Sequence, residues 1–183
     1  SETTDKLLAF LCSCGIGVYL LSNAKSLFKA YTGAYQKIDP KPEDIMIFCH
    51  DDIEIRESPE EFVRKLTESL SLPESGFVGP EGQEYLTPYG PPGDVVVLDG
   101  LFLAARKKVI DEVGLEKPEY FEGEWDFYDI HYTSQAFLKG YTNKVIDMNI
   151  LHNSRGELVG RDSWHKNREA FIANTELPME IKP

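Results

Sequence analysis

Apolar and polar positions follow one another along the chain in blocks that predict alternating strands and helices. Short apolar runs predict strands at residues 7–12, 18–21, 45–49, 76–80, 94–105 and 144–151. Apolar residues at helical spacing predict helices at residues 24–35, 59–72, 107–113, 125–139 and 163–174. Because strands and helices alternate, the pattern predicts an α/β fold with a mostly parallel sheet flanked by helices.

Capping residues at the block ends support several of these helices. Ser58 stands before Pro59 and three residues before Glu61, which is the pattern of a capping box with proline in the first helical position. Ser22 or Asn23 is expected to cap the helix at 24–35.

The connection between the first two predicted strands, 7–12 and 18–21, is very short. Parallel neighbouring strands need a crossover of about a dozen residues. The two strands are therefore expected to be antiparallel, or to lack a connecting segment.

The composition excludes some classes of partner. The chain has 183 residues, enough for one domain, and a net charge of −12. A strongly acidic protein does not bind nucleic acid or anionic membranes through a broad basic face. A nucleotide ligand stays open, since a metal ion can offset the charge locally.

Three cysteines and one apolar stretch bear on the compartment. The number of cysteines is odd, and Cys12, Cys14 and Cys49 lie in apolar surroundings, which predicts that all three are buried free thiols. Free thiols in turn predict that the protein is in a reducing compartment, the cytoplasm. Residues 7–21 are too short for a comfortable membrane span and contain two glycines, so no span is predicted.

The most informative stretch is the apolar run at 45–49, which ends in His50, Asp51 and Asp52. Ligands of open α/β sheets bind at the carboxyl ends of strands. Carboxylates there are suited to Mg²⁺ or Mn²⁺, which commonly hold substrate phosphates. The stretch therefore indicates a metal–diphosphate site. The alternative is a polar strand end followed by a solvated acidic loop.

Two further polar residues lie at predicted element ends. Asp129 is near the start of a helix, where a carboxylate also suits the helix dipole, and His152 follows a strand. Either residue alone has an ordinary structural explanation.

Several segments, in this order, resemble the family 2 glycosyltransferases, in particular their short relatives with the GT-A fold. The segments are 22–27 (SNAKSL), 30–31 (AY), 48–53 (FCHDDI), 97–106 (VLDGLFLAAR), 128–131 (YDIH), 140–141 (GY), 151–156 (LHNSRG) and 164–171. The resemblance implies a Rossmann-like GT-A domain over residues 1–183. Its donor-nucleotide half would be about 1–55 and its acceptor half about 76–175.

The resemblance also implies roles for individual residues. Asp52 and His152 would bind Mn²⁺, or Mg²⁺, and the metal would stabilise the diphosphate leaving group of a nucleotide sugar, expected to be UDP-linked. Asp129 would be the general base for an inverting transfer to a hydroxyl acceptor such as a glycan. The donor would be bound by Ser22, Asn23 and Asp51. The acceptor would be bound by Asp99, Gly100, Glu124 and Trp125.

Some positions depart from the family pattern, and two other functions remain open. Thr32, Tyr128 and His131 stand where many members have Asn, Glu and Asp. The segment before residue 22 is shorter than usual, which leaves the nucleotide-base pocket undefined. A metal-dependent phosphoesterase or nucleotidyltransferase would use the same carboxylates. A non-catalytic GT-A-like module would bind a nucleotide sugar or carbohydrate without turning it over.

Overall fold

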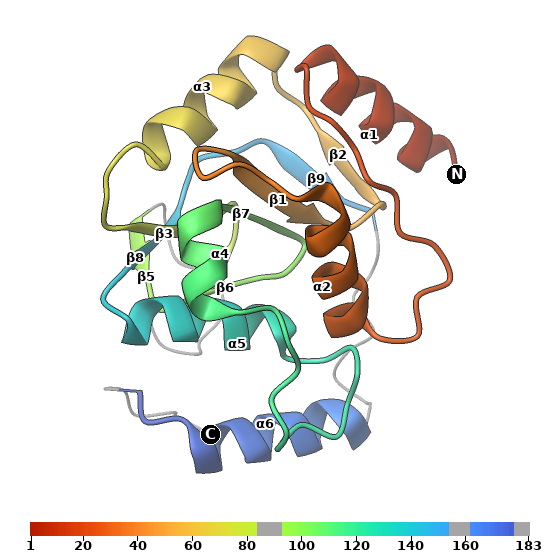
Figure 1. The fold of residues 1–183 in the computed structure, drawn as a ribbon. Helices are drawn as coiled ribbons and strands as arrows, with labels where there is room; N and C mark the ends of the chain where they lie inside the picture. The colour runs from red at the N-terminus through yellow and green to blue at the C-terminus, as the bar shows by residue number, and fades with distance from the viewer. Residues whose placement is uncertain (84–92, 154–161, 178–183) are drawn as a thin grey trace.

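A five-stranded mixed sheet forms the centre of the computed structural model, which describes residues 1–83, 93–153 and 162–177. Helices cover both faces of this sheet (Figure 1). The strand order is β1 (Ile45–Cys49), β7 (Phe102–Arg106), β3 (Ser75–Gly79), β8 (Thr142–Val145) and β5 (Gly93–Val95). The β3–β8 pair is parallel, whereas β1–β7, β3–β7 and β5–β8 are antiparallel. The prediction of an α/β fold is confirmed, but the prediction that its sheet is mostly parallel is wrong.

The first predicted strand is a helix, α1 (Glu2–Ser13). Its buried residues Thr4, Leu7 and Leu11 recur at helical spacing, and the helix packs against β2 (Ile53–Ile55) and α3 (Pro59–Ser69). The Ser1 hydroxyl caps the helix by accepting from the Thr4 N–H at 3.2 Å. A short contiguous apolar run fits either a strand or a buried helix face, and here burial on one face decides for the helix.

The second predicted strand, at residues 18–21, also does not form. Residues 16–22 have no regular secondary structure, and Val18, Tyr19 and Leu20 have 41%, 44% and 55% of their surface exposed. The question of how two strands are connected therefore does not arise. Among the residues that the structure describes, β1 therefore pairs only with β7 and lies at the edge of the sheet.

All five predicted helices are confirmed, and four of them have different ends from those predicted. They are α2 (Leu27–Ile38), α3 (Pro59–Ser69), α4 (Lys107–Val113), α5 (Tyr128–Leu138) and α6 (Asp162–Asn174). The cap of α2 is Ser26, whose hydroxyl accepts from the Lys29 N–H at 3.2 Å, so neither Ser22 nor Asn23 is the cap. The cap of α3 is Ser58, as predicted, and it accepts from the Glu61 N–H at 3.2 Å.

The start of α5 shifts because of one backbone conformation. Phe127 has a left-handed φ of 68°, so the helix begins at Tyr128 and not at the predicted residue 125. This turn directs the side chain of Phe127 into the core, where its ring contacts Trp164 and Phe171 of α6.

Two small ladders lie beside the main sheet. β4 (Gly82–Gln83) pairs with β6 (Val97–Leu98), and β2 pairs with β9 (Ile150–His152). The long strand predicted at 94–105 is divided into β5, β6 and β7, and the gap between β6 and β7 includes Asp99 and Gly100, which interrupt the apolar run. Residues 81–93 are rich in Gly and Pro, a composition typical of a loop, but Gly82–Gln83 form β4 and Gly93 begins β5, while residues 84–92 lie outside the described residues.

Alternating residues of the central strands supply two cores. Leu103 and Ala105 of β7 pack with α2, α4, α5 and α6, whereas Phe102 and Ala104 pack with α1 and α3. This alternation is the period of two expected for a strand buried on both faces.

The cysteines and the helices test two smaller predictions. The three cysteines are free, but Cys12 is exposed and the other two are half-buried, so the expectation that all are buried is wrong. Across the part of the chain that the structure describes, no helix is long and apolar enough to cross a bilayer.

Candidate functional site

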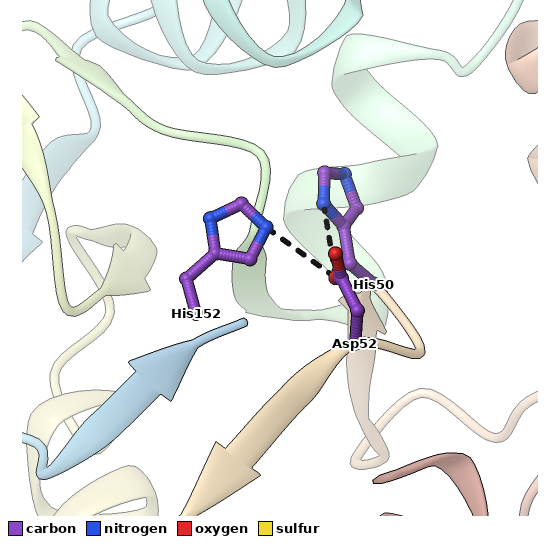
Figure 2. Close-up of side chains that lie close together, drawn as sticks. All are labelled: His50, Asp52 and His152. Carbon is purple, nitrogen blue, oxygen red and sulfur yellow. Dashed lines mark ion pairs between the residues drawn. The ribbon is translucent and has the colours of Figure 1, made fainter. Parts of the chain in front are cut away.

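Three polar side chains from three strand ends converge on one point (Figure 2). His50 follows β1, Asp52 precedes β2, and His152 is the last residue of β9. The β2–β9 register pairs Ile53 with His152, and the Asn153 N–H donates to the Asp52 carbonyl at 3.0 Å. Strand pairing therefore brings together residues from distant parts of the sequence.

The spacing of these side chains fits a metal ion. Asp52 Oδ1 lies 3.3 Å from His152 Nε2 and 4.0 Å from His50 Nδ1. The three candidate ligand atoms lie within 4.8 Å of one another. Bond lengths of about 2.0–2.2 Å, as at zinc sites, place neighbouring ligand atoms roughly 3–3.5 Å apart. The Asp52–His152 distance is in this range, and His50 needs only a small shift to reach it.

Asp52 Oδ1 is also short of partners. The atom is buried, and no hydrogen bond to it forms within residues 1–83, 93–153 and 162–177. A buried carboxylate oxygen without a hydrogen bond carries a desolvation penalty. A cation between this oxygen and the imidazole nitrogens would remove that penalty, so the donor set fits a metal ion.

The surroundings of the cluster favour a cation. Burial lowers the pKa of His50, so its imidazole is neutral at neutral pH and keeps a lone pair for a metal. Burial, followed by the nearby Asp99 carboxylate, raises the pKa of Glu81. A divalent cation near Glu81 and Asp99 would interact favourably with both carboxylates.

Asp129 lies at the first turn of α5 and is held by two backbone groups. Its Oδ2 accepts from the Gly100 N–H and its Oδ1 from the Ile130 N–H, both at 2.9 Å. Burial and the Asp99 charge raise the pKa of Asp129 to about 7, against the lowering effect of the two backbone hydrogen bonds. Desolvation therefore outweighs hydrogen bonding at this carboxylate.

Gly100 links the two centres. The Tyr128 hydroxyl donates to the Gly100 carbonyl at 3.0 Å, and it also lies 3.0 Å from His50 Nε2. A Cβ at residue 100 would lie 2.1 Å from the Tyr128 oxygen, so only glycine allows this approach.

An open cleft of about 1820 Å³ brings most of the predicted site residues together. Those that line it are Ser22, Asn23, Asp51, Asp52, Asp99, Gly100, Trp125, Asp129 and His152. Glu124 is not among the lining residues. Its carboxylate pairs with Lys117 at 2.9 Å, and its carbonyl accepts from the N–H of Leu27.

The lining residues differ in how firmly they are held. Asp51 is exposed, and its Oδ2 accepts from the Thr4 hydroxyl of α1 at 3.1 Å. Trp125 donates from Nε1 to the Lys25 carbonyl at 3.1 Å while 43% of its surface stays exposed. Asp99 is exposed, and its Oδ1 accepts from the Leu101 N–H at 2.9 Å.

The sequence predicted no role for three residues of this site. His50 was part of the acidic motif, and its place two residues before Asp52, across a turn, was the available signal. Glu81 and Tyr128 gave no signal, because strand and helix packing bring them to the cleft. Unlike His50 and His152, His131 is not part of the cluster. It packs against Phe121 and Tyr132 in the core, and burial lowers its pKa to about 4.

Comparisons with known proteins bear on the fold. No protein-family model matches the sequence, and the search of curated proteins found no match. Among solved structures, the chain is similar to one described as the crystal structure of A197 from STIV, with a TM-score of 0.56 and 15% identity. The match covers 80% of this chain and 78% of that one. At this identity the similarity supports a shared fold and nothing about activity.

Proposed function

We propose that this chain is a metal-dependent inverting glycosyltransferase with a GT-A-like fold, which moves a sugar from a nucleotide-diphosphate sugar to a hydroxyl acceptor. The main support is the convergence of Asp52 and His152 at 3.3 Å around a buried carboxylate oxygen without a hydrogen bond. The order of the sequence motifs suggests the reaction class, and the spacing of Asp52 and His152 fits a metal site for that reaction.

Asp52 and His152 would hold the cation. When bound, the cation would stabilise the negative charge that develops on the diphosphate leaving group. An imidazole ligand favours Mn²⁺ over Mg²⁺. Asp51, at the rim of the same cleft, would contact the donor ribose or orient the ligands.

Asp129 would take the proton from the acceptor hydroxyl. Both of its oxygens are held by backbone N–H groups, which fixes the direction of the carboxylate. Its pKa, raised to about 7, suits a general base that works near neutral pH. The exposed ring of Trp125, in the same cleft, offers a surface for the acceptor sugar.

Two other functions are consistent with the same cluster. A metal-dependent phosphoesterase or nucleotidyltransferase would act on phosphate esters without a sugar acceptor. A binding module would keep the ligand and do no chemistry. The feature that favours sugar transfer is Asp129, a second and separately held carboxylate with a raised pKa, because hydrolysis at the metal would not need it.

The first test is whether nucleotide binding depends on metal. The chain is acidic, and carboxylates surround the cluster, so a diphosphate should be repelled unless a cation is present. UDP titrated by calorimetry should bind with Mn²⁺ present and bind far more weakly with EDTA. A panel of nucleoside diphosphates, followed by thermal shift, would identify the base. Equal affinity with Mn²⁺ and with EDTA would remove the metal from the proposal.

A further inference from the structure

We infer that His50 is a third ligand of the cation, through Nδ1, and that the Tyr128 hydroxyl selects the imidazole tautomer that makes this possible. The inference rests on the proposed metal site of Asp52 and His152. It adds to that site a ligand from the residue that follows β1 and a positioning residue from α5.

The tautomer follows from the hydrogen bonds of one hydroxyl group. The Tyr128 hydroxyl has a single proton, and it donates this proton to the buried Gly100 carbonyl at 3.0 Å. The hydroxyl oxygen can then only accept from His50 Nε2, which lies 3.0 Å away. Nε2 therefore carries the imidazole proton, and Nδ1 keeps its lone pair.

The opposite tautomer satisfies fewer groups. Were Tyr128 to donate to Nε2, the Gly100 carbonyl would lose the donor that the structure gives it. The Nδ1 proton would then point toward Asp52 Oδ1 at 4.0 Å, which is too long for a hydrogen bond. The tautomer with the proton on Nε2 avoids both losses.

The free lone pair is on the nitrogen that faces the cluster. Nδ1 of His50 lies 4.0 Å from Asp52 Oδ1, and the imidazole of His152 lies beside it, with ring centroids 5.6 Å apart (Figure 2). The site would thus offer two imidazole nitrogens and one carboxylate. This donor set favours Mn²⁺, Fe²⁺, Co²⁺ or Zn²⁺ over Mg²⁺ or Ca²⁺. The other coordination positions of the metal ion would be open to water and substrate.

Tyr128 is a positioning residue in this arrangement, because it acts on the cation through His50. Hydrogen-bond partners of metal-bound histidines orient the ring, and their loss costs about 10–100-fold in metal affinity. Tyr132 provides a matched control on the same helix. Its hydroxyl is also buried and donates to a carbonyl, that of Leu115, at 2.7 Å, and the residue does not line the cleft.

The experiment counts metal-bound nitrogens in the full chain loaded with Mn²⁺ alone. Pulsed electron paramagnetic resonance should detect two imidazole nitrogens in the wild type, and one each in His50→Ala and His152→Ala. Tyr128→Phe should keep the fold, checked by thermal unfolding, and weaken Mn²⁺ binding by about 10–100-fold. Tyr132→Phe should leave Mn²⁺ affinity unchanged.

The possible failures are distinguishable. One nitrogen signal in the wild type, unchanged in His50→Ala and lost in His152→Ala, would overturn the inference and leave the proposed Asp52–His152 site standing. Equal Mn²⁺ affinity in Tyr128→Phe and Tyr132→Phe would overturn the positioning role. No Mn²⁺ binding by the wild type would overturn both the inference and the metal-dependent function.

Discussion

The two polar centres of the cleft are built in opposite ways. Asp52 keeps a buried oxygen without a hydrogen bond among the described residues, and its neighbours are two imidazoles at 3.3 and 4.0 Å. Asp129 instead has both oxygens bonded to backbone N–H groups at 2.9 Å. The first centre has a buried acceptor oxygen without a hydrogen bond from any described residue, whereas in the second both carboxylate oxygens accept hydrogen bonds and the pKa is raised.

This difference separates binding from chemistry. A buried carboxylate oxygen without a hydrogen bond gains most from a bound ion, so substitution of Asp52 should change ligand binding. A carboxylate held in place with a pKa near 7 gains little from a ligand but can take a proton, so Asp129 should affect how fast the reaction runs.

Asp129→Asn should have the largest effect. The change keeps the shape of the side chain and removes its ability to accept a proton. Transfer should fall by about 10²–10⁴-fold, while binding of UDP and Mn²⁺ is retained. Single-turnover kinetics together with calorimetry would measure both. If the variant instead lost UDP binding, Asp129 would belong to the binding centre and the division would fail. Near wild-type transfer would place the base at another carboxylate.

The same substitution should change how stability depends on pH. The pKa of Asp129 is raised to about 7 on folding, so the folded protein resists ionising this group. The wild type should lose stability, relative to Asp129→Asn, as the pH rises from about 4 to 7, by about 2–4 kcal/mol. Urea unfolding of both proteins at pH 4 and pH 8 would measure it. The Asn variant leaves one backbone N–H without a carboxylate partner, but this cost does not vary with pH. A pH-independent difference between the two proteins would contradict the raised pKa.

At the first centre, Asp52→Ala and His152→Ala should couple. Both side chains would touch one ion, so removal of either already loses most of what the other contributes. The double variant should weaken Mn²⁺ binding less than the sum of the single variants, with a coupling energy of about 0.5–3 kcal/mol. Mn²⁺ titrations of the four proteins form the cycle. Asp94→Ala, an exposed carboxylate on β5 outside the cleft, is the control and should not couple to His152→Ala. Additive effects of the first pair would mean that the two residues do not share an ion.

Local patterns in the sequence determined much of the secondary structure. The cap at Ser58, the end of α4 before Gly114 and the strand at β1 depend on residues adjacent in the chain, and each forms where it was predicted. The acidic motif at 50–52 also marked one part of the candidate site, because a run of polar residues directly after an apolar strand is visible without a structure.

The tertiary structure decided the N-terminal segment and the sheet. Residues 7–12 are apolar enough for a strand, but they bury one face against β2 and α3 as a helix. With no strand formed at 18–21, the described part of the chain gives β1 one neighbour, the antiparallel strand β7. Which partner a strand takes depends on contacts between distant segments, and an apolar run does not specify them.

The site itself divides in the same way. The sequence identified Asp52, His152 and Asp129 as candidates from their places at element ends. The β2–β9 register set the distance between the first two, and burial beside Asp99 set the pKa of the third. The contact of Tyr128 with His50 and Gly100 depends on the packing of α5 against two strand ends. Residue types are written in the sequence, but ligand spacing and desolvation arise only when distant segments pack together.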